Sequence, residues 1–101
     1  MKINIQTIDF KASKSLEKFV DSKISKLSKK YADIIRADIS LKRGPANVPG
    51  NKYCSLYISH SGENQYLKKS GDSYEESIAK AIDGMDKIFE RLKRKKNKLM
   101  K

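Results

Sequence analysis

Two segments with apolar residues at helical spacing flank a middle region of alternating apolar and polar residues, and this pattern constrains the fold most. In the first segment, residues 14–32, apolar side chains recur every three or four positions from Leu16 to Tyr31. In the second, they recur in the same way from Tyr74 to Leu92. Because this spacing gives each helix one apolar stripe, both helices must pack against another apolar surface.

Four shorter segments alternate between apolar and polar residues, which is typical of half-buried strands. The connections between the last three are too short for a parallel crossover, so we expect antiparallel pairing there. A chain of 101 residues sustains one hydrophobic core, so we expect a single α+β domain over residues 1–101 with the order β-α-β-β-β-α and a frayed basic end at residues 93–101. The expected strands are residues 2–8, 35–42, 52–60 and 65–69.

Small polar residues mark where the two helices begin. Ser13 stands before the first helical pattern and can cap it. Ser73 is followed three residues later by Glu76, which is the spacing of a capping box. Cys54 lies among apolar neighbours on the third strand, and we interpret it as a small core residue.

The formal net charge is +11, from 23 Lys and Arg residues against 12 Asp and Glu residues. A polyanion, most commonly a nucleic acid, is the expected partner of such a chain. Phosphate neutralisation makes this binding depend on salt and carries little sequence information. The sequence has no apolar run of roughly eighteen residues and no signal-peptide pattern, so we expect a cytoplasmic protein without a membrane partner.

The cations are segregated on the two predicted helices. At about 100° per residue, one row falls beside the apolar stripe of the first helix, while Glu17 and Asp21 fall on the opposite flank. A second row follows one flank of the second helix, and helices lying side by side could merge the two rows into one basic surface. The predicted RNA-binding residues are Lys23, Lys26, Lys29, Lys30, Lys80, Lys87, Arg91, Arg94, Lys95 and Lys98.

Several motifs occur in a familiar order along nearly the whole chain. The run from Lys23 to Tyr31 reads Lys-x-x-Lys-Leu-x-Lys-x-aromatic and follows the pair Phe19-Val20. The second helix opens with the sequence Asp-Ser-Tyr at residues 72–74 and ends in a Lys-rich tail. These features resemble the ribosome hibernation promoting factor and ribosome-associated inhibitor family, in its short form without the C-terminal dimerisation domain of long members.

The resemblance implies a four-stranded sheet with two parallel helices packed on one face. It further implies binding to the small ribosomal subunit, in the channel used by mRNA and tRNA, which silences translation in stationary or starved cells. In the family, contacts are made largely to ribosomal RNA through helix cations. Lys23, Lys26 and Lys29 match the family pattern by position. The assignment of the second-helix cations rests on helix geometry as much as on alignment. A separate modulation factor that pairs ribosomes is a further partner that the resemblance allows.

Alternative functions stay open on the residues themselves. A double-stranded RNA-binding domain has the order α-β-β-β-α, and the leading strand at residues 2–8 counts against it. A small ribonuclease needs an acid and a base near the scissile phosphate, but His60 is the only histidine, so we expect no enzyme, cofactor, metal or small-molecule substrate. Tyr53 and Tyr57 share one strand face and offer a surface for stacking bases, although such tyrosines more often cover aliphatic neighbours.

Overall fold

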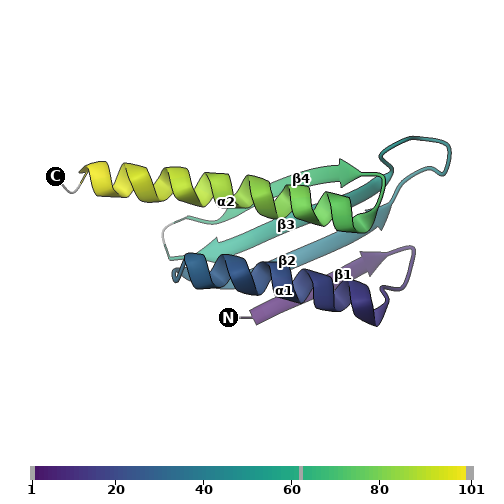
Figure 1. Ribbon diagram of the computed structural model, residues 1–101, viewed down its shortest axis with the longest axis horizontal. Helices are drawn as coiled ribbons and strands as arrows, with labels where there is room; N and C mark the ends of the chain where they lie inside the picture. Colours follow the sequence, from purple (N-terminus) through teal and green to yellow (C-terminus); the bar gives the residue numbers. More distant parts are fainter. Residues whose placement is uncertain (1, 62, 100–101) are drawn as a thin grey trace.

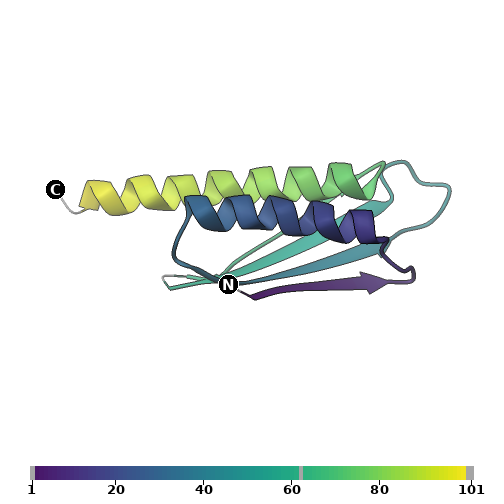
Figure 2. The same cartoon turned by 60° about the horizontal axis from the view of Figure 1, so that its bottom comes forward.

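Two helices lie on one face of a four-stranded sheet (Figures 1 and 2). The computed structural model describes residues 2–61 and 63–99, with side chains described up to Lys95. This architecture confirms the predicted α+β fold and its element order. The elements are β1 (Lys2–Ile8), α1 (Lys14–Lys30), β2 (Ile34–Arg43), β3 (Lys52–His60), β4 (Gln65–Gly71) and α2 (Tyr74–Leu99).

The strands lie in chain order across the sheet, β1-β2-β3-β4. β1 pairs with β2 in parallel, whereas β2, β3 and β4 pair antiparallel, as their short connections predict. The parallel pair requires a crossover, and α1 supplies it. Since α1 and α2 run in the same direction over the sheet, the predicted parallel helix pair is also confirmed (Figure 1).

The helix starts follow the predicted capping residues. Leu16 N donates to Ser13 Oγ at 3.1 Å, and Glu76 N donates to Ser73 Oγ at 3.1 Å. The Glu76 side chain accepts from the main-chain N–H of Asp72, one residue earlier than a standard capping box places this bond. Both helix starts therefore have side-chain partners for otherwise unpaired backbone N–H groups.

Two predicted boundaries were wrong by two residues. α1 ends at Lys30 and not at residue 32, because Tyr31 has an extended backbone (φ −127°, ψ 96°). Its side chain still packs in the core, which is why the helical pattern included it. β4 continues to Gly71, two residues beyond its expected end. The basic end that we expect to fray is described as helix up to Leu99, and residues 100 and 101 lie outside the described residues.

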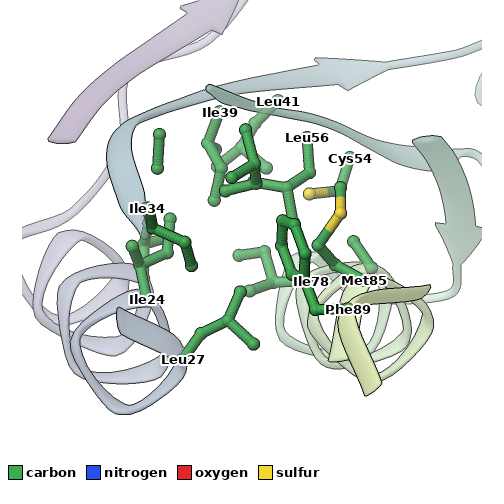
Figure 3. Close-up of a cluster of buried hydrophobic side chains, with 14 of the residues drawn as sticks. Ile24, Leu27, Ile34, Ile39, Leu41, Cys54, Leu56, Ile78, Met85 and Phe89 are labelled. Atoms are coloured by element: carbon green, nitrogen blue, oxygen red, sulfur yellow. The ribbon is translucent and has the colours of Figure 1, made fainter. Parts of the chain in front are cut away.

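The core lies between the helix layer and the sheet (Figure 3). Each helix contributes its apolar stripe, and the central strands contribute every second side chain. Burial of each large aliphatic side chain stabilises the fold by about 1.5–3 kcal/mol, so this layer contact fixes both helices to the sheet. Among the fully buried side chains are Val20, Ile24, Ile39, Leu41, Cys54, Leu56, Ile58, Ile78 and Met85.

The Cys54 thiol provides a probe of this core. It is fully buried, and its burial raises its pKa to about 12. We expect a thiol reagent such as Ellman's reagent to label the native protein about a hundredfold or more slowly than the denatured protein, because the thiolate is the reactive form. Spectrophotometric labelling with and without guanidinium measures this ratio, and equal rates would contradict the described core.

Candidate nucleic-acid interface

Two of the predicted cations of α1, Lys23 and Lys30, lie on the flank that faces α2. Lys30 Nζ is 3.0 Å from Asp86 Oδ1 on α2. Seven residues earlier on the same flank, Lys23 lines a shallow pocket together with α2 residues that include Lys80 and Asp83. Lys23 and Lys30 therefore face both acidic and basic side chains of α2 across the boundary between the helices.

Lys30, Tyr31 and Asp86 form a polar seam that joins the two helices. Lys30 Nζ contacts both Asp86 carboxylate oxygens, at 3.0 and 3.2 Å, and the Tyr31 hydroxyl donates to the same carboxylate. The hydrogen bond from Tyr31, together with Lys30, holds the pKa of Asp86 below its usual value. The hydrogen bond to Asp86 raises the pKa of Lys30, so both partners stay charged at neutral pH.

On α2, Lys80 contacts β4 in addition to lining the pocket with Lys23. Lys80 Nζ donates to the main-chain carbonyl of Ser70 on β4 at 3.3 Å. Gly84 also faces β4, since a Cβ added there would lie 3.2 Å from a methyl group of Leu67. Helical geometry puts Lys87 and Arg91 on the same side of α2 as Lys80.

Lys23 of α1 and Lys80 of α2 line the same shallow pocket, so the two predicted rows come together there, beside the acids Glu76 and Asp83. Asp83 and Asp86 of α2 occupy the side nearer α1. Helical periodicity identifies residues that share a flank, but it does not say which neighbour that flank meets. The helix layer therefore carries cations of both helices, with acidic side chains among them at the helix boundary.

The predicted contact residues differ in whether a carboxylate neutralises them. Lys80 pairs with Glu76 at 3.0 Å and Arg94 with Glu90 at 2.9 Å, in addition to the Lys30 pair. Such exposed pairs contribute only about 0–1 kcal/mol, so an incoming phosphate can replace the carboxylate. Lys98 has a side chain outside the described residues. Among the described side chains, no ion pair involves the other predicted residues, Lys23, Lys26, Lys29, Lys87, Arg91 and Lys95.

One of these cations makes a cation–π contact with an aromatic ring. Lys23 Nζ lies 5.5 Å from the centroid of the Phe19 ring, one helical turn earlier. The stem of Lys23 is half-buried, whereas Lys26 and Lys29 are exposed. Lys23 is therefore held more firmly than its neighbours, and its ammonium group stays directed along the α1 flank.

A cleft of about 790 Å³ opens where α2 passes the ends of α1 and β3. Its lining includes the apolar side chains of Ile34, Phe89 and Leu92 and the cations Lys30 and Lys93. The sequence gives no signal for this cleft, because its walls come from three separate segments of the chain. The residues that line it are Lys30, Tyr31, Ala32, Asp33, Ile34, His60, Ser61, Glu63, Phe89, Leu92 and Lys93.

The side chain of His60 lines this cleft and packs against one of its aromatic residues. Its ring packs edge-on against Phe89, with 4.9 Å between the ring centroids, and Glu63 N lies 3.4 Å from its Nδ1. Within residues 2–61 and 63–99, no three His, Cys, Asp or Glu side chains are grouped so as to hold a metal ion. In the same part of the chain, no helix is long and apolar enough to span a membrane.

The sequence matches one protein family over almost its entire length. The family profile described as "Sigma 54 modulation protein / S30EA ribosomal protein" matches residues 3–99. The chain therefore belongs to this family, which confirms the resemblance seen in its motifs. None of the curated protein sequences compared with the chain matches it.

Solved structures share the fold despite low sequence identity. The chain is similar to a ribosomal subunit interface protein from Coxiella burnetii, with a TM-score of 0.81, 12% identity, and coverage of 93% of this chain and 99% of that chain. It is also similar to the N-terminal domain of Protein Y from Thermus thermophilus, with a TM-score of 0.73, 14% identity, and coverage of 90% and 94%. These likenesses support the fold, independently of the family match.

The polar seam gives a testable pH dependence. Because the folded-state pKa of Asp86 is lowered, its stabilising effect is present above the unfolded pKa of about 3.9 and is lost as the pH falls through the folded value. We expect Asp86→Asn to lower the free energy of unfolding by about 1–2 kcal/mol near neutral pH, and by less near pH 3. Guanidinium unfolding followed by circular dichroism measures both differences.

Asp83→Asn is the matched control, since Asp83 is on the same helix and makes no ion pair among the described side chains. We expect it to change stability little at either pH. An Asp86→Asn protein as stable as the wild type at neutral pH would show that the seam does not join the helices.

Proposed function

We propose that this chain binds the small ribosomal subunit in the channel used by mRNA and tRNA, and thereby blocks translation in stationary or starved cells. Membership of the S30EA family over residues 3–99 carries the proposal. The cationic helix layer supports it, because exposed Lys and Arg on rigid helices are suited to ribosomal RNA phosphates. The name of the Coxiella burnetii neighbour refers to a ribosomal subunit interface, and the proposal extends that location to this chain.

The proposed mechanism is steric and electrostatic. The sheet holds α1 and α2 at fixed positions, so their cations meet phosphates without reorganising. The bound domain then excludes mRNA and tRNA, and no covalent bond is made or broken. Release of condensed counterions drives the binding, so its affinity falls as the salt concentration rises.

The positions of the charges refine where RNA would lie. Lys26 and Lys29 of α1 and Lys87 and Arg91 of α2 are exposed to solvent. Asp86 repels phosphate but is needed to hold Lys30 and Tyr31. RNA is therefore expected on the exposed cations of the helix layer and not at the Asp86 carboxylate. A ribosome-pairing modulation factor would act as a separate partner of the same ribosome.

Reversing one exposed cation on each helix tests the proposal. We expect Lys29→Glu combined with Lys87→Glu to weaken binding to small subunits about tenfold or more and to reduce the salt slope by about two. Both side chains are exposed and make no described ion pair, so the free energy of unfolding should change by no more than about 0.5 kcal/mol. Co-sedimentation with separated subunits at several salt concentrations measures the affinity.

The control variant, Lys11→Glu with Arg43→Glu, changes the net charge equally but places the reversals outside both helices, at exposed positions. This control variant should retain most of the affinity for small subunits. In the same assay, mRNA and tRNA should compete with the wild-type protein for binding. If both variants lost the same amount of affinity, net charge alone would explain the effect. Preference for free duplex RNA over small subunits would instead favour the double-stranded RNA-binding alternative.

A further inference from the structure

The sheet face opposite the helices is uncovered by any described element (Figure 2). Alternation along the strands places every second side chain on it, since the intervening ones fill the core. We call this surface the open face. Its members are Lys2, Asn4, Gln6, Ile8, Arg36, Asp38, Ser40, Lys42, Tyr53, Ser55, Tyr57, Ser59, Tyr66, Lys68 and Ser70.

Two tyrosines on the open face are direct cross-strand neighbours. Tyr57 of β3 pairs with Tyr66 of β4 in the antiparallel register, and their side chains are 38% and 59% exposed. Directly opposite side chains have Cβ atoms about 4.5–5.5 Å apart, so the two rings form one aromatic strip. The other exposed large apolar side chains, Ile8, Ile35 and Val48, lie apart on other segments.

Hydrogen bonds hold these rings at their hydroxyl ends. Asn64 Nδ2 donates to the Tyr57 hydroxyl oxygen at 2.8 Å, and the Tyr66 hydroxyl lies 3.4 Å from Ser55 Oγ. Such contacts limit ring motion while leaving ring surface in solvent. The third tyrosine differs, because Tyr53 packs against the loop after β2, where a Cβ on Gly44 would lie 2.7 Å from its ring. Tyr53 thus has a structural role that Tyr57 and Tyr66 lack.

Asp38, the register partner of Tyr57, and several cations surround the aromatic strip. Beside it, Lys68 Nζ lies 4.9 Å from the centroid of the Tyr53 ring. The acid Asp38 is engaged by Arg36, with 2.9 Å between Arg36 Nε and Asp38 Oδ2, and this contact lowers the pKa of Asp38. Among the described open-face residues, Asp38 is the sole acid, against the four cations Lys2, Arg36, Lys42 and Lys68.

We propose that the open face binds single-stranded RNA, with unpaired bases stacked on Tyr57 and Tyr66 and phosphates contacted by Lys68 and Lys42. Aromatic rings stack with any base, and neighbouring cations follow the backbone. A protein partner would be expected to meet a contiguous aliphatic centre, whereas this face surrounds its rings with cations, hydroxyls and amides. The site is separate from the helix layer, so it does not rest on the proposed function.

Replacing the two rings without changing charge tests this site. The probe is a fluorescently labelled single-stranded oligouridylate of about ten nucleotides, followed by anisotropy at low salt. We expect Tyr57→Leu with Tyr66→Leu to bind it about tenfold or more weakly than the wild type, because the stacking surface is lost. The matched control, Tyr57→Phe with Tyr66→Phe, keeps the rings and should bind within about twofold of the wild type.

Equal affinities of the Leu and Phe variants would overturn the proposal. It would also be overturned if the Leu variant kept its RNA affinity and lost self-association, since the face would then contact protein. Should the Leu variant fail to fold, Lys68→Gln provides a second test, with an expected decrease of about one in the salt slope and an unchanged slope as the contrary result. The Leu and Phe variants are also compared in a protein that carries Lys29→Glu and Lys87→Glu. A difference in RNA affinity that persists there shows that this site is separate from the helix layer.

Discussion

Both helices bury an apolar stripe on the same face of one sheet, and this constraint determines where the charged side chains of the molecule lie. It places α1 and α2 side by side, so that one flank of each helix meets the other. Lys30, Tyr31 and Asp86 join those flanks, and Lys26, Lys29, Lys87 and Arg91 are left exposed to solvent. The same constraint leaves the second face of the sheet open to solvent (Figure 2).

This arrangement explains how a small, highly cationic domain can present more than a uniform charge. The apolar core sets the spacing of the helices, and acidic side chains of α2 lie among the cations at the helix boundary. Cations held on two rigid helices suit the phosphates of a folded RNA. The open face adds exposed rings, which suit unpaired bases instead.

Much of the fold could be predicted from residue periodicity, because strand alternation and helical stripes report directly which side chains are buried. Periodicity also identified cations that share a flank, but not the neighbour of that flank, so Asp86 as the partner of Lys30 was missed. The pairing of Tyr57 with Tyr66 depends on strand register, which local sequence does not state. The RNA contacts of the predicted cations stay a prediction.

Hydroxyl-radical probing from iron chelates tethered at Lys29→Cys and Lys87→Cys tests the central claim most directly. The native Cys54 is buried and should not compete for the tether. Ribosome-bound protein is expected to cleave small-subunit RNA around the mRNA and tRNA channel, at different sites from the two positions, and mRNA with tRNA should abolish the cleavage. Cleavage confined to large-subunit RNA, or unaffected by mRNA and tRNA, would contradict binding in that channel.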